Sequence, residues 1–147
     1  MYYGAVTTHL CSYKSDGGDS QMKETRKMSN EAMAPGFSRG SEDEALWFTT
    51  NRITIKARAE ETGGAFGMIE ALAPPGFSPP LHIQHGEAEA FLILEGEVTF
   101  RCGEDTFRAG PGDFAFVPRH APHSFVVEGT APADEVTAAL LSAVSAV

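Results

Sequence analysis

The stretch Gly76–Gly96, GFSPPLHIQHGEAEAFLILEG, decides the fold of this chain. Turn-forming residues at its two ends bracket a run that alternates in the manner of a β-strand. Four side chains with metal-binding atoms lie within eight positions of this run, namely His82, Gln84, His85 and Glu89. Because a strand points residues i and i+2 to the same face, we expect His82 and Gln84 to face one cavity and His85 to face away from it.

A second cluster lies in residues 110–125, GPGDFAFVPRHAPHSF. A turn containing glycine and proline precedes a short apolar strand over residues 114–117, and a loop then carries His123 to the start of the next strand. Two ligand-bearing strands brought together across a barrel would place His82, Glu89 and His123 around one point. Imidazole and carboxylate groups are common protein ligands of transition metals, so the two clusters together predict a metal site.

Each of these residues also has an ordinary structural explanation. A single histidine beside prolines is most often a loop or core residue, and His85 and His120 keep that interpretation. Glu89 has the alternative of being a surface carboxylate. It shares a strand face with Phe91 and Ile93, however, and a carboxylate that begins an inward apolar row is costly to bury unless it is paired or bound to a cation.

The length and charge of the chain limit its class. At 147 residues, with 42% hydrophobic and 21% charged residues, it has the make-up of one ordinary globular domain. Residues 1–40 carry five Lys and Arg against four Asp and Glu, so residues 41–147 carry six against sixteen, a net charge of −10. Such an acidic domain repels nucleic-acid phosphates and anionic membranes, so we expect neither as a partner.

The cysteines and the apolar runs bear on location. Cys11 and Cys102 are the only cysteines, and a single pair gives no framework of several disulfides, which fits a reducing compartment. The N-terminus lacks the apolar segment of a signal peptide. The longest apolar run, Val136–Val147, has twelve residues and is too short to cross a bilayer. We therefore expect a soluble, cytoplasmic protein.

The chain divides into a leader and a domain. Residues 1–40 lack sustained periodicity and are rich in Gly, Ser, Lys and Asp, which predicts a flexible arm. Residues 41–147 form the predicted domain, in which short alternating segments separated by turns indicate an all-β sandwich or barrel. Glu70, in the segment AFGMIEALA, is a candidate hydrogen-bond partner of the site. A closing strand is expected after Val127, but the alanine-rich C-terminus favours a short helix from about Asp134.

The first cluster resembles the first motif of the cupins. That motif is Gly, five residues, His, one residue, His, three or four residues, Glu, six residues, Gly. This chain matches it at Gly76, His82, Glu89 and Gly96, with Gln84 at the place of the second histidine.

The second cluster resembles the second cupin motif, which is Gly, five residues, Pro, one residue, Gly, two residues, His. The matching residues are Gly112, Pro118 and His123, with His120 in place of the glycine and Val127 where an Asn often lies. The resemblance spans about residues 45–128. The surrounding sequence is similar to small bacterial cupins related to quercetin 2,3-dioxygenase.

The resemblance implies a double-stranded β-helix, or jelly-roll barrel, which is commonly a homodimer. It also implies one divalent transition metal, held by three histidines and a glutamate; on this chain those places fall to His82, Gln84, Glu89 and His123. The metal could be Fe, Mn, Ni, Co, Cu or Zn. Cupins include dioxygenases, isomerases, decarboxylases and proteins with no known reaction, so the fold alone does not name the chemistry.

Two functions remain open. If Gln84 is not a ligand, two histidines and one carboxylate remain, the set used by non-haem Fe(II) oxygenases. The first hypothesis is thus a metal-dependent oxygenase of a small aromatic or polyketide-like substrate, with Glu89 as a base. The second is a non-catalytic binding or sensing module with weak or no metal. The expected apolar interior comprises Ile53, Ile55, Phe66, Met68, Phe91, Ile93, Phe114, Phe116 and Phe125.

Overall fold

The structure is a computed structural model that describes residue 36, residues 45–130 and residues 138–145. In this part of the chain every helix or strand assigned is a β-strand. The strands are β1 (Ala45–Phe48), β2 (Asn51–Ala57), β3 (Gly67–Ala73), β4 (Ala88–Glu95), β5 (Val98–Cys102), β6 (Asp105–Ala109), β7 (Phe114–Val117), β8 (His123–Val127) and β9 (Ala138–Ser145).

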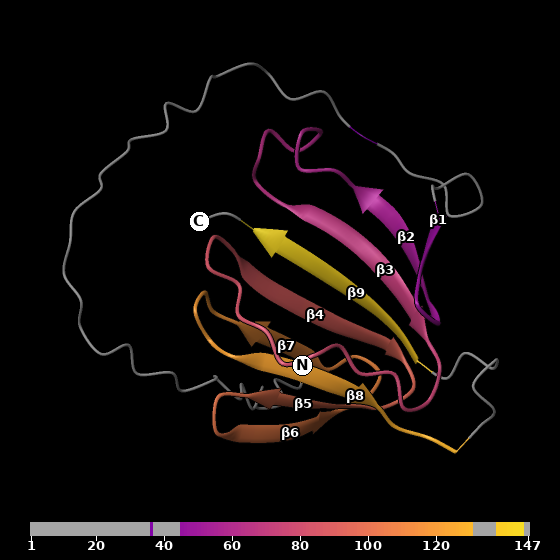
Figure 1. Cartoon of the computed structure of the whole chain (residues 1–147). Helices are drawn as coiled ribbons and strands as arrows, with labels where there is room; N and C mark the ends of the chain where they lie inside the picture. The colour runs from indigo at the N-terminus through magenta and orange to yellow at the C-terminus, as the bar shows by residue number, and fades with distance from the viewer. Residues whose placement is uncertain (1–35, 37–44, 131–137, 146–147) are drawn as a thin grey trace, which may run out of the picture.

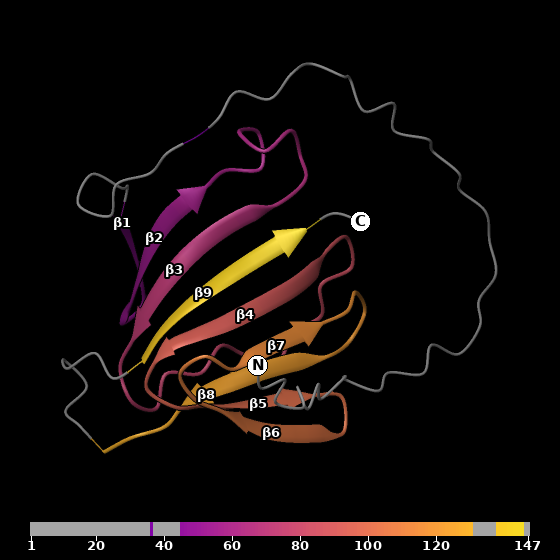
Figure 2. The same ribbon diagram turned by 180° about the vertical axis from the view of Figure 1, so that it is seen from behind.

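The strands form two antiparallel sheets. The larger sheet has the order β1-β2-β3-β9-β4-β7, and the smaller sheet has the order β6-β5-β8. Figure 1 shows the larger sheet curving over the smaller one, and Figure 2 shows the same two layers from behind. The predicted all-β jelly-roll fold is confirmed. Among the residues that the structure describes, no helix has the length and apolar character needed to cross a bilayer.

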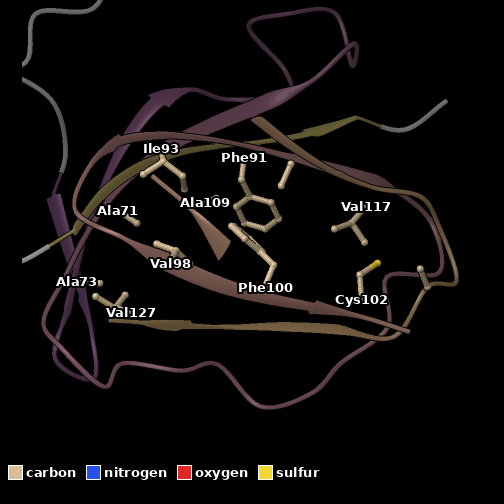
Figure 3. Close-up of a cluster of buried hydrophobic side chains, with 12 residues drawn as sticks. Ala71, Ala73, Phe91, Ile93, Val98, Phe100, Cys102, Ala109, Val117 and Val127 are labelled. Atoms are coloured by element: carbon tan, nitrogen blue, oxygen red, sulfur yellow. The ribbon is translucent and has the colours of Figure 1, made fainter. Parts of the chain in front are cut away.

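The core lies between the two sheets and is built by alternation along each strand. Phe91 and Ile93 of β4 face Val98 and Phe100 of β5 in the enclosed space (Figure 3), and all four are at most 3% exposed. The rings of Phe91 and Phe100 have centroids 5.1 Å apart, a favourable separation for an aromatic pair. Glu89 precedes Phe91 and Ile93 on the inward face, so the core row leads directly to the candidate ligand.

Three aromatic residues expected in the interior lie on the surface instead. Phe66, Phe114 and Phe116 are 38%, 62% and 40% exposed, so their assignment to the core was wrong. In β7 the inward positions belong to Ala115 and Val117, which are each 1% exposed. Both faces of β7 carry apolar residues, and a one-residue change of register exchanges them. Hydrophobicity alone therefore does not identify the inward face.

The predicted C-terminal helix is also wrong over residues 138–145. These residues form β9, which pairs with β3 on one side and β4 on the other, as both views show. Without β9, two strands of the larger sheet would be left with unpaired edges, and pairing on both sides outweighs the helix propensity of alanine. Residues 134–137, like the predicted arm apart from Gly36, lie outside the described residues.

Candidate metal centre

A backbone bridge between His82 and His123 joins the two clusters on one side of the site. The His82 N–H donates to the His123 carbonyl at 3.1 Å, and the His123 N–H donates to the His82 carbonyl at 2.9 Å. This reciprocal pair makes the two residues direct antiparallel neighbours. Their imidazole rings consequently lie side by side, with centroids 4.2 Å apart and a tilt of 56°.

Glu89 completes the cluster from the opposite sheet. It lies on β4 of the larger sheet, whereas His123 begins β8 of the smaller sheet. Glu89 Oε2 lies 3.2 Å from His123 Nε2, and His82, Glu89 and His123 each offer one ligand atom within 4.8 Å of the others. The geometry thus brings together three of the four predicted ligands.

Two backbone carbonyls orient the imidazole rings. His82 Nδ1 lies 2.8 Å from the carbonyl oxygen of Pro80, and His123 Nδ1 lies 3.0 Å from that of Ala121. A carbonyl oxygen only accepts hydrogen bonds, so Nδ1 carries the proton in both rings. This leaves each Nε2 as the atom with the available lone pair, the usual arrangement of a metal-binding histidine.

Without a cation, the contact between Glu89 and His123 requires a proton on His123 Nε2. Burial raises the pKa of Glu89, but hydrogen bonds from His123 and Ser142 and the nearby imidazoles outweigh it, so its pKa is lowered from 4.5. Burial lowers the pKa of His123, but its hydrogen bond with Glu89 and the Ala121 carbonyl outweigh this, so its pKa is raised from 6.5. The pair therefore favours a carboxylate beside a positive charge.

Ser142 is a member of the site that the sequence did not suggest. Its hydroxyl donates to Glu89 Oε1 at 2.7 Å, and the residue is 2% exposed on β9. The two oxygens of Glu89 thus have separate partners, one in β9 and one in β8. A serine inside an apolar C-terminal run was the available signal, but assigning that run to a helix hid its pairing with β4.

The other candidate residues lie elsewhere. Gln84 is half-buried, and its backbone carbonyl accepts the His120 N–H at 2.8 Å. The role of its side chain as a fourth ligand stays a prediction. His85 and His120 are exposed and contact each other through their Nδ1 atoms, 3.3 Å apart. Glu70 forms an ion pair with Lys56 at 3.0 Å. Its predicted hydrogen bond to the site is wrong, because Ala71 and Ala73 take the core-facing positions of β3.

A solvent-open cavity adjoins Glu89. Its volume is about 360 Å³, within the range of small-molecule sites, roughly 300–1,000 Å³. Most of the residues around it are apolar, while Arg58, Glu60, Glu89 and Ser142 supply polar or charged groups. The lining includes Ile55, Ile69, Glu89, Ser142 and Val144.

The comparisons with known proteins agree with this geometry. Residues 68–137 match the family model described as "Cupin domain". This segment is a cupin domain. His82, Glu89 and His123 all lie inside the matched segment. The two motifs that resemble those of the cupins also lie wholly inside it.

A curated relative is quercetin 2,3-dioxygenase of Bacillus subtilis (strain 168), 28% identical over 101 residues. The match covers 69% of this chain but only 30% of the relative, so the chain spans less than a third of that protein's length. The similarity therefore supports the family relationship and leaves the relative's activity as a hypothesis for the cupin domain.

Two solved structures share the fold. KdgF from Halomonas sp. has a TM-score of 0.66 and 15% identity, covering 78% of this chain and 96% of that chain. The polyketide cyclase RemF from Streptomyces resistomycificus has a TM-score of 0.63 and 20% identity, covering 78% and 81%. Identities this low establish the shared barrel fold and nothing about a shared reaction.

Proposed function

We propose that this cupin domain binds one divalent transition-metal ion through His82 Nε2, His123 Nε2 and the Glu89 carboxylate. The observation that carries the proposal is the orientation of the two rings, because both Nδ1 atoms are held by backbone carbonyls and both Nε2 atoms remain for a ligand role. Atoms bound at 2.0–2.2 Å to one ion lie about 3–4 Å apart. A cluster within 4.8 Å needs only a small contraction to meet that requirement.

We further propose that the domain is an oxygenase of a small aromatic or polyketide-like substrate. Two histidines and one carboxylate form the ligand composition of non-haem Fe(II) oxygenases, which leave positions open for dioxygen and substrate. The name of the curated relative points to the same chemistry. A bound metal would supply Lewis acidity and access to dioxygen.

The cavity suggests how the chain's own residues treat the substrate. Ile55, Ile69 and Val144 offer apolar surface on which an aromatic ring can pack, and Glu89 lies in the same lining. Glu89 is ionised at neutral pH, since its pKa is lowered, and can therefore accept a proton from an acidic enol. Ser142 holds one carboxylate oxygen in place while the other is directed toward His123.

Metal loading tests both steps separately. The metal-free full chain is loaded anaerobically with Fe(II), Mn(II), Ni(II) or Co(II), and bound metal and thermal stability are measured before any assay. We expect one ion at the centre and an increase in melting temperature that a chelator reverses. Oxygen uptake with flavonols and related enols then tests the oxygenase. No bound metal under any loading would refute the metal centre, while bound metal without turnover would refute the oxygenase alone.

The second candidate function is a binding or sensing module, favoured by Gln84. An amide carbonyl is a weaker ligand for Fe, Ni, Cu or Zn than an imidazole. If metal affinity rises at least about tenfold in Gln84→His, while the unaltered protein binds flavonols without metal, the binding module is the better account. Metal-dependent flavonol binding by the unaltered protein would favour the enzyme.

We also propose that the partner of this chain is a second copy of itself. β1 is an outer strand of the larger sheet and exposes Leu46, Trp47 and Phe48, by 48%, 74% and 57%. An exposed apolar edge strand is a site for pairing with another chain. Light scattering should show a dimer that Trp47→Lys dissociates, and a monomer at all concentrations would contradict this.

A further inference from the structure

A second pair of histidines lies outside the candidate centre. His85 and His120 are exposed, whereas His82 is half-buried and His123 is buried. The Nδ1 atoms of the exposed pair are 3.3 Å apart, with ring centroids separated by 5.5 Å. The proposed function does not use this pair.

We propose that His85 and His120 form an exterior binding site for a divalent transition-metal ion such as Zn²⁺, Ni²⁺ or Cu²⁺. Two imidazole nitrogens bound to one tetrahedral zinc ion at 2.0–2.1 Å lie about 3.3 Å apart. The two Nδ1 atoms already have this separation, 3.3 Å. Zinc binding therefore requires no change in the separation of the two nitrogens, and the exposed position of both histidines leaves the remaining coordination positions open to water.

The backbone holds the two histidines at this distance. The His120 N–H donates to the carbonyl of Gln84, the residue before His85, at 2.8 Å. The reciprocal His82–His123 bridge joins the same two segments a few residues away. Because the two histidines are carried on paired backbone, less conformational freedom is lost on binding an ion than between two unconnected loops.

The conformation of His120 points to a use for its side chain. Its φ of 68° lies in the left-handed region, which residues with a Cβ atom rarely adopt and glycine adopts readily. The second cupin motif, which the sequence resembles, has glycine at this place. Strained residues cluster at ligand-binding sites, and here the strained residue contributes one of two converging nitrogens.

A direct hydrogen bond is the competing explanation for the short distance. It requires a proton on one Nδ1 and a lone pair on the other. Metal binding instead requires lone pairs on both, with the protons on Nε2. The two explanations therefore differ in the tautomer of one ring, which ¹⁵N chemical shifts of the imidazoles distinguish.

Zinc titration of the full chain tests the proposal. In the double variant His82→Ala/His123→Ala, we expect one Zn²⁺ to bind and to shift the imidazole ¹⁵N signals of His85 and His120. Adding His120→Gly removes one of the two ligands. Loss of a residue that only hydrogen-bonds to a ligand typically weakens metal affinity by roughly 10–100-fold, so loss of the ligand itself should weaken it further. Gly suits the left-handed backbone, so the substitution should leave the fold intact.

A second series guards against misfolding of the double variant. In the otherwise unaltered chain, His120→Gly and His85→Ala should each bind one Zn²⁺ fewer than the parent, and both should keep the interior ion. Unchanged stoichiometry and affinity in both variants would overturn the exterior site. So would ¹⁵N shifts showing that one of the two Nδ1 atoms still carries a proton at saturating Zn²⁺.

Discussion

Replacing Ser142 with alanine should destabilise the metal-free fold and weaken metal binding. The Ser142 hydroxyl donates to Glu89 Oε1 at 2.7 Å from a position that is 2% exposed. Hydrogen bonds to charged groups contribute about 1.5–3 kcal/mol, so Ser142→Ala should lower the free energy of unfolding by about that amount. With a urea m-value of about 2 kcal/mol/M, the unfolding midpoint should fall by about 1 M.

The assay is urea unfolding followed by intrinsic fluorescence, with a chelator present to remove metal. Ser124→Ala on β8 is the matched control, because Ser124 is a half-buried strand serine one position beyond His123 and so faces away from the centre. The same variants are then titrated with metal, and Ser142→Ala should lose roughly 10–100-fold in affinity. Equal unfolding midpoints in the two variants would refute the claim that Ser142 holds Glu89.

Three further predictions concern the charged pair, the strained histidine and the core. In metal-free protein the Glu89–His123 pair should stabilise the fold most between pH 4.5 and pH 6.5, the ordinary pKa values of glutamate and histidine. As pH falls, this stabilisation is lost when Glu89 is protonated at its lowered pKa. As pH rises, it is lost when His123 is deprotonated at its raised pKa. Unfolding measured across pH should show this optimum, and Glu89→Gln should flatten both limbs. His120→Gly should raise the free energy of unfolding of the metal-free protein by about 1 kcal/mol, since the strain of a left-handed backbone conformation is relieved. A lower free energy of unfolding, measured by chemical denaturation, would contradict this. Phe100→Ala should cost about 3–5 kcal/mol and Phe114→Ala less than about 0.5 kcal/mol, and similar costs would show that the inward face of β7 is misassigned.

The inward face of the strand that carries Glu89 was predictable from the sequence because the local signals agreed there. Glu89, Phe91 and Ile93 alternate with a period of two, and turn residues mark both ends of the stretch. Their shared inward face in the structure follows directly from that pattern. The two motifs likewise predicted that His82 and His123 belong to one site, and the structure places them together.

The missing parts depend on long-range pairing, which no local pattern encodes. Residues 138–145 have helix-favouring alanines, and only the gap between β3 and β4 makes them a strand. That error also concealed Ser142, whose contact with Glu89 spans 53 positions. The inward face of β7 was also predicted wrongly. Phe114 and Phe116 are larger and more apolar than Ala115, so local hydrophobicity favoured the face that the structure exposes.

A crystal structure of metal-loaded protein, with anomalous data collected at the absorption edge of the metal, tests the central claim most directly. We predict one peak about 2.0–2.2 Å from His82 Nε2, His123 Nε2 and a Glu89 oxygen. A saturated crystal with no peak between these three side chains, and with the Glu89–His123 hydrogen bond intact, would contradict the claim.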